Sequence, residues 1–217
     1  MKKKIAVVMS EASDIASDKE FYDFEGNVVI KNKVKNGERG NELVPFTAAI
    51  YANAELGKSN LNKKYTGEYT ILNDFTQYQL KDFIKQGRFV YHDVDGEARV
   101  LDDINGLLKV TDAKGSEFKD NQVVRITDAL AIADARAFNM MYLGKVNIDT
   151  AGIESYRNRV IDIREAFVEK HALVDYDKKN LTVEKVEGKR GAVKVNSAVT
   201  PAECFRQVYI TNIVQTK

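Results

Sequence analysis

The stretch that decides the fold is Phe118–Phe138, FKDNQVVRITDALAIADARAF, followed by Tyr142–Asp149, YLGKVNID. Apolar residues recur at steps of three and four from about Asn121, which predicts a long amphipathic helix with one buried face. The apolar positions of this helix are Val123, Ile126, Leu130, Ala133, Ala137 and Met141. Gly144 is placed to end the helix, because glycine readily adopts the left-handed conformation of a helix C-terminus.

A second apolar stripe follows the first and predicts another long helix. Its members are Ile153, Tyr156, Val160, Ile163 and Phe167. We expect the two stripes to face each other or a shared sheet. Burial of each stripe would contribute on the order of 10 kcal/mol before the entropy of ordering is subtracted. The two helices therefore indicate a hydrophobic core, and not a cofactor site.

The C-terminal third reads as strands. Leu181–Val186 and Ala192–Val199 alternate in hydrophobicity on either side of a turn at Gly188–Gly191, as expected of a hairpin. A further strand is predicted over Cys204–Val214.

The N-terminal half alternates strands and helices. Ile5–Met9 is a short β-branched run, and Asn27–Lys35 alternates before an Asn-Gly turn, so both read as strands. A helix is predicted from Val44-Pro45, because proline suits the first helical turn, with Gly57 to terminate it.

Two further local signals follow in this half. Thr76 and Gln79 have the spacing of a capping box, which predicts a short helix that ends at Gly87. Asp95-Gly96 separates two strand-like runs, and this dipeptide favours the tight turn of a β-hairpin. The fold class expected for the chain is therefore α+β. Residues 1–96 would form a small α/β part, and residues 97–217 a C-terminal domain of two packed helices and a sheet with an extended C-terminal strand.

Composition excludes several classes of function. The 217 residues include 33 basic and 32 acidic side chains, so no uniform field is expected to recruit nucleic acid or an anionic membrane. No stretch approaches the ~20 apolar residues of a membrane helix. The single cysteine, Cys204, cannot form an intramolecular disulfide, which fits either a reducing compartment or indifference to redox conditions.

Candidate chemistry is sparse. Gly57-Lys58-Ser59 contains the tail of a phosphate-binding loop, but it follows a predicted helix instead of opening one. The two histidines, His92 and His171, do not have metal-chelating spacing. Cys204 with either histidine could form a nucleophilic pair, and the alternative to a structural role is therefore a small cytosolic cysteine-dependent hydrolase. No catalytic residue, metal or cofactor is otherwise predicted.

Several short motifs resemble the C-terminal part of contractile tail sheath proteins of phages, phage-like elements and R-type bacteriocins. The order and spacing of the motifs carry this resemblance more than any single one. The matching positions are Ile104 and Asn105; Phe118, Arg125, Asp128, Ile132 and Asp134; Gly144, Lys145, Val146 and Asn147; and Val195, Asn196, Val199 and Pro201.

The resemblance implies a non-enzymatic subunit that stacks in rings around an inner tube and contracts collectively, without a cofactor. Its partners would be copies of itself, the tail tube protein, and baseplate or terminator proteins. It would assemble in the bacterial host cytoplasm and reside in the tail of the mature virion or particle. Family members usually carry an N-terminal arm and further sequence before the segment that starts here at Ile5, so the mesh between subunits would lack one of its two connecting strands.

The resemblance also implies which residues meet a neighbour. An extended arm, about Arg206–Lys217, would insert as a strand into another subunit. Its contact residues would be Val208, Tyr209, Ile210, Thr211, Asn212, Ile213 and Val214. Four basic residues are expected to contact the tube or an adjacent subunit, namely Lys119, Arg125, Lys178 and Lys179.

Overall fold

The computed structural model describes residues 7–11, 23–37, 40–112 and 114–212. Its first half is built on a three-stranded parallel sheet of β1 (Val7–Ser10), β2 (Asn27–Ile30) and β5 (Arg88–Phe89), with β2 in the centre. Val28, Val29 and Ile30 are fully buried. Such a continuous apolar run is typical of a parallel strand covered on both faces.

Among its described residues, this half also contains two antiparallel strand pairs and two α-helices. The strand pairs are β3 (Lys33–Val34) with β4 (Ile71–Leu72) and β6 (Tyr91–Val94) with β7 (Glu97–Val100); the helices are α2 (Val44–Ala52), preceded by η2 (Asn41–Leu43), and α3 (Gln77–Lys85). Asp95 and Gly96 both have positive φ between β6 and β7, so the predicted hairpin is confirmed. Edge-to-face contacts join Phe89, Tyr91 and Tyr65 in the core.

The helix signals of this half are confirmed at α3 but not at the end of α2. At α3 the hydroxyl of Thr76 and the side chain of Gln79 form the predicted capping box, and Gly87 follows with φ 67°. Helix α2 stops at Ala52 instead of at Gly57. Gly57 serves a different purpose, because a Cβ there would lie 2.5 Å from the carbonyl oxygen of His171. The glycine permits close approach of two distant loops.

The second half contains the two long helices. After η3 (Ser116–Lys119), α4 (Asn121–Ala137) begins at the capping carboxylate of Asp120, and α5 (Thr150–Glu169) begins at that of Asp149. After α5 the chain forms the short helix η5 (Lys178–Asn180) and then the antiparallel pair β8 (Leu181–Lys185) and β9 (Val193–Ser197). This strand pair packs against α5. The fold is α+β, as predicted.

Except for Met141, the residues of the predicted stripes are buried or, at Ala133 and Ile153, partly buried. Ile126 and Leu130 of α4 pack against Ile163 and Phe167 of α5. The prediction that Met141 is buried is wrong, because its side chain is 48% exposed. Helix α4 changes to a π-helical turn, η4 (Phe138–Tyr142). A π turn holds more residues than an α turn and so rotates Met141 away from the stripe.

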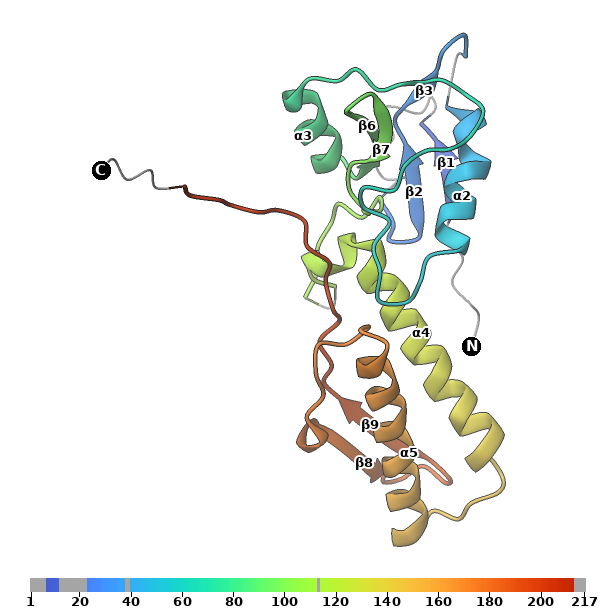
Figure 1. The fold of residues 1–217 in the computed structure, drawn as a ribbon. Helices are drawn as coiled ribbons and strands as arrows, with labels where there is room; N and C mark the ends of the chain where they lie inside the picture. Colours follow the sequence, from blue (N-terminus) through green and yellow to red (C-terminus); the bar gives the residue numbers. More distant parts are fainter. Residues whose placement is uncertain (1–6, 12–22, 38–39, 113, 213–217) are drawn as a thin grey trace, which may run out of the picture.

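Figure 1 shows how the halves are arranged. Helix α4 leads from the sheet of the first half to the layer of α5, β8 and β9, and the chain after β9 returns to the middle of the molecule before projecting outward. The structure assigns no strand to residues 202–212, so within a single chain the predicted strand over Cys204–Val214 does not form. Ile213 and Val214 lie outside the described residues. The division of the chain at residue 96 stays a prediction.

Candidate assembly interface

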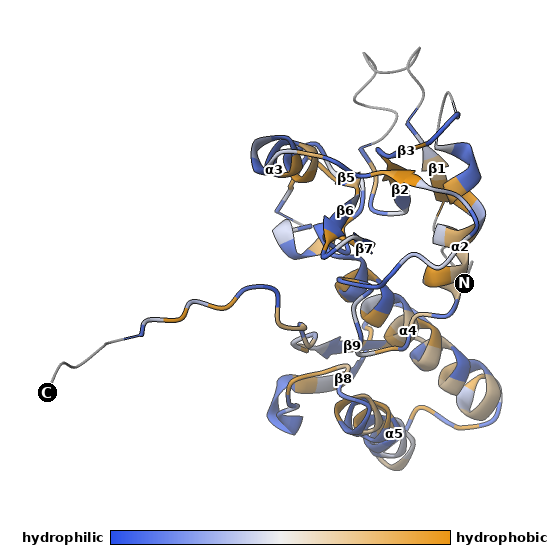
Figure 2. Ribbon diagram, turned by 45° about the horizontal axis from the view of Figure 1, so that its top comes forward, coloured by the Kyte–Doolittle hydropathy of each residue, from blue (hydrophilic) through white to orange (hydrophobic). Residues whose placement is uncertain are grey.

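The C-terminal arm, defined here as residues 207–212 of the described chain, extends away from the body (Figures 1 and 2). Val208, Tyr209 and Ile210 are 76%, 90% and 73% exposed, and Phe205 just before them is 99% exposed. The hydrogen bond that the structure records for the arm stays within it, from the Tyr209 hydroxyl to Gln207 Oε1 at 2.8 Å. With respect to the described part of the chain, the arm therefore offers apolar side chains and unpaired backbone groups to a partner.

The segment before the arm is held tightly. The amide of Ala202 donates to the carbonyl of Ala172 at 2.9 Å, and the carbonyl of Ala202 accepts from Gln122 Nε2 at 2.9 Å. Pro201 forms a β-bridge with Leu173. Residues 200–202 are thus fixed to both the start of α4 and the loop after α5.

Arg206 makes the last of these attachments. Its Nη1 lies 2.9 Å from Asp102 Oδ1, and its Nη2 forms an ion pair with Asp120 Oδ2. Asp102 follows β7, whereas Asp120 caps α4, so one guanidinium joins both halves of the molecule to the root of the arm. The arm was predicted to begin at Arg206, and the structure attaches this residue to the body.

Asp103 is the centre of the junction between the halves. Its carboxylate is fully buried and accepts hydrogen bonds from the Tyr51 hydroxyl at 2.9 Å and the Asn60 amide at 2.8 Å. Arg125 Nη2 lies 3.4 Å from the same carboxylate. Burial raises the pKa of Tyr51 well above its ordinary value, and the charge of Asp103 adds to this effect. The local sequence around Asp102 and Asp103 does not distinguish a buried junction from a polar turn.

The four basic residues predicted to contact the tube or a neighbour lie on three elements. Lys119 ends η3, beside a cavity of about 220 Å³. Arg125 belongs to α4 and donates to the carbonyl of Lys58 at 2.6 Å as well as facing Asp103. Lys178 and Lys179 lie on η5, and Lys178 pairs with Glu165 at 2.7 Å. Arg125 thus directs its guanidinium into the chain, and contact of these residues with a partner stays a prediction.

The outer edges of the sheet formed by β8 and β9 have no strand partner among the described residues. In the part of the chain that the structure describes, each of these strands pairs only with the other. Leu181, Val183 and Val195 pack on the side of the sheet that faces Tyr156 and Val160 of α5. The sheet therefore has an apolar layer that a third strand could extend.

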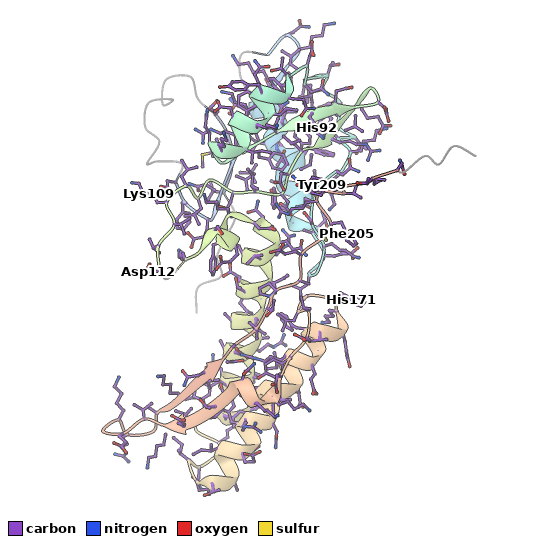
Figure 3. All side chains as sticks on the ribbon, turned by 90° about the vertical axis from the view of Figure 1, so that its left-hand side faces the viewer. His92, Lys109, Asp112, His171, Phe205 and Tyr209 are labelled. Carbon is purple, nitrogen blue, oxygen red and sulfur yellow. The ribbon has the colours of Figure 1, made fainter. Side chains whose placement is uncertain are left out.

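The residues of the hydrolase alternative, Cys204, His92 and His171, lie on three different segments of the chain. Cys204 Sγ lies 3.8 Å from the carbonyl oxygen of Gly57. His92 belongs to β6 in the first half and His171 follows α5, as Figure 3 shows. Burial lowers the pKa of His92, opposed by the charge of Asp93. Within the described residues no hydrogen bond joins Cys204 to either histidine.

The described residues contain no cluster of His, Cys, Asp and Glu side chains able to hold a metal ion. None of the helices found there has the length and apolar character needed to cross a membrane.

Comparison with known families gives two adjacent matches. Residues 1–106 match the central domain of phage tail sheath proteins, and residues 113–215 match the phage tail sheath C-terminal domain. These domains define a protein of the phage tail sheath class. The chain belongs to the phage tail sheath family.

Similar structures have the same fold. The sheath tail protein of Desulfitobacterium hafniense is 23% identical with a TM-score of 0.77, and the match covers 96% of this chain and 48% of that protein. The Listeria innocua sheath tail protein is 20% identical with a TM-score of 0.74, over 93% of this chain and 47% of that one. A sheath complex of an extracellular contractile injection system in its contracted state gives a TM-score of 0.70 at 11% identity, with 98% of this chain and 65% of that chain covered.

A curated relative adds sequence similarity. The uncharacterised protein YqbK of Bacillus subtilis (strain 168) is 22% identical in an alignment 188 residues long that covers 79% of this chain and 40% of YqbK. The chain spans about half the length of the two sheath tail proteins and less than half of YqbK.

Proposed function

We propose that this chain is the part of a sheath subunit that joins copies to one another, and that its arm completes a sheet in a neighbouring copy. The observation that carries this proposal is the exposure of Val208, Tyr209 and Ile210 on a segment without hydrogen bonds to its own body among the described residues. Membership of the sheath family supports assembly as the use of this surface.

The acceptor in this proposal is the sheet of β8 and β9 in another copy. An added strand satisfies the unpaired backbone groups of a sheet edge, and alternate side chains then point to opposite faces. Val208 and Ile210 would share one face of the arm, and Gln207, Tyr209 and Thr211 the other. The face with Val208 and Ile210 suits the apolar layer that Val183 and Val195 form over α5.

We further propose that a sheath built from these subunits contracts around an inner tube. In this proposal the bodies move largely as rigid units and the arms act as hinges, while a modest free-energy gap per subunit adds up over the sheath. The tail tube protein and baseplate or terminator proteins are the further partners, with Lys119, Arg125, Lys178 and Lys179 as candidate contacts. Assembly would take place in the bacterial host cytoplasm.

Removal of residues 207–217 tests the proposal. The shortened chain should stay folded, since residues 207–212 add little to the body, but it should not form sheath-like polymers. Sedimentation velocity and electron microscopy measure assembly, and thermal unfolding measures the body. A matched control replaces Val208–Val214 with a Gly/Ser segment of equal length, which keeps chain length and removes the apolar side chains. Assembly of both variants at the level of the full chain would contradict the proposal.

A further inference from the structure

The attachments of the C-terminal run end abruptly at one residue. Backbone and side-chain hydrogen bonds fix Pro201 and Ala202, Cys204 Sγ faces the carbonyl of Gly57, and Arg206 forms two ion pairs. From residue 207 to 212 the recorded hydrogen bonding stays within the segment. Arg206 is therefore the boundary between a segment held by the body and one that leaves it.

The charges around Arg206 make this boundary strong. The side chains of Asp102 and Asp120 are 18% and 10% exposed, and that of Arg206 is 31% exposed. Charged pairs with little solvent contact are screened less than surface pairs. Of the basic side chains nearby, Arg125 faces the buried Asp103, which leaves Arg206 as the cation paired with both Asp102 and Asp120 among the described residues.

Each of the two carboxylates is also held by a backbone hydrogen bond that does not involve Arg206. Asp120 Oδ1 accepts from the Gln122 amide at 2.7 Å as the cap of α4, and Asp102 Oδ1 accepts from the Asp103 amide at 2.8 Å. Burial raises the pKa of both carboxyl groups, and the charge of Arg206 opposes that rise. Two oriented carboxylates thus form a fork that holds a guanidinium in one position.

We propose that Arg206 is the positioning residue of the arm: its ion pairs with Asp102 and Asp120 fix the point and direction at which the arm leaves the body. This inference rests on the proposed function, in which the arm pairs with a neighbour. A strand held at its root samples fewer orientations than a strand on a loose tether. Preorganisation of this kind lowers the entropy lost on binding.

Trypsin cleavage after Arg206 tests the attachment in the unassembled chain. Trypsin must take the arginine side chain into its own pocket, so cleavage requires that Arg206 leave the two carboxylates. The variant Asp102→Asn/Asp120→Asn removes both negative charges and keeps the cap of α4, because asparagine caps helices as well as aspartate. Cleavage after Arg206, followed by mass spectrometry, should become about tenfold faster.

An internal reference separates this effect from general loosening. Arg190 lies in the exposed turn between β8 and β9, and cleavage after it should keep the same rate in the variant. Equal rates after Arg206 in the original chain and the variant would overturn the proposal. So would equal acceleration at Arg206 and Arg190, because that result indicates loss of fold instead of release of the arm.

Assembly supplies the second readout. Arg206→Gln, placed in the Asp102→Asn/Asp120→Asn background to avoid leaving two unpaired carboxylates, should raise the protein concentration needed for half-maximal assembly about tenfold. Arg190→Gln should leave it unchanged. Unchanged assembly of the Arg206 variant would overturn the positioning role, even where deletion of residues 207–217 abolishes assembly. If the deletion also leaves assembly intact, the proposed function itself fails.

Discussion

The body of the molecule and its arm treat side chains in opposite ways. The body buries charge: Arg88, Asp103 and Arg164 are each at most 5% exposed and take part in ion pairs or hydrogen bonds. The arm exposes apolar groups, with Val208, Tyr209 and Ile210 in solvent. Buried charges that are already paired need nothing more, whereas exposed apolar groups are stabilised only by a partner. The difference indicates that these buried charges find their partners within one chain, whereas the exposed apolar side chains of the arm are available to a partner.

The largest expected effect lies in the body. Arg164 on α5 forms a two-pronged ion pair with Asp134 on α4, one contact being 2.7 Å from Nη2 to Oδ2. Arg164→Ala leaves a partly buried carboxylate without its partner and should lower the free energy of unfolding by about 3 kcal/mol. Chemical denaturation measures this change.

The control for Arg164 is on the same helix. Arg159 is 41% exposed and lies 3.8 Å from Asp162, so Arg159→Ala should change stability by no more than about 0.5 kcal/mol. The Arg164 variant should still assemble at temperatures where it is folded. Equal effects of the two substitutions on the free energy of unfolding would show that burial of the Arg164–Asp134 pair does not add to stability. The contrast between the body and the arm would then not hold for the body.

The next largest effect concerns assembly. Val208→Asp/Ile210→Asp places charges on the face proposed to meet a neighbour, and should weaken assembly about 100-fold, since each apolar side chain is worth ~1.5 kcal/mol or more on burial. Unfolding of the body should change by no more than about 0.5 kcal/mol. Light scattering over a concentration series measures the change in assembly.

Its control carries the same charge on the opposite face. Gln207→Asp/Thr211→Asp should weaken assembly much less, because alternate residues of a strand point away from the acceptor sheet. If both double variants weaken assembly alike, the arm is not recognised as a strand with two different faces.

The smallest effect is a pH dependence of the body. Burial raises the pKa of Glu11, but hydrogen bonds and charges from Lys31 and Arg88 outweigh it, and the net pKa lies below the ordinary value of 4.5. Because the folded pKa lies below the unfolded one, this stabilisation is present above pH 4.5 and is lost as pH falls through the folded pKa. Its size is on the order of 1 kcal/mol.

A comparison of the original chain with Glu11→Gln isolates the contribution of Glu11 to the pH dependence of the unfolding free energy. Asp102 and Asp120 have raised pKa values, so their contribution has the opposite sign: it is present below the ordinary value of 3.8 and is lost as pH rises through the folded pKa. The difference in unfolding free energy between the original chain and Glu11→Gln should therefore shrink on acidification, although the total changes less. A difference that stays constant from pH 7 to pH 3 would contradict the assignment.

Local signals in the sequence predict most of the fold. The capping box at Thr76, the turn at Asp95-Gly96 and the stripes of α4 and α5 depend on residues within a few positions of one another. The predicted end of α2 at Gly57 and the predicted burial of Met141 were wrong, because tertiary contact at Gly57 and a π turn after α4 decided them.

The junction could not be predicted for the same reason. Asp103 meets Tyr51, Asn60 and Arg125, which are brought together only by the folded chain. Likewise, nothing local distinguishes Arg206 from the other exposed arginines. The exposure of the arm follows from the resemblance to a family, whereas its point of attachment is a property of this structure.

The fork at Arg206 also determines how tension would travel through the molecule. A pull on residues 207–212 reaches Arg206 first and divides there, one branch passing through Asp102 into the strands of the first half and the other through Asp120 into α4. Because the two ion pairs of Arg206 would be loaded in parallel, each would carry only part of the force. The two halves would then be drawn along together instead of being peeled apart.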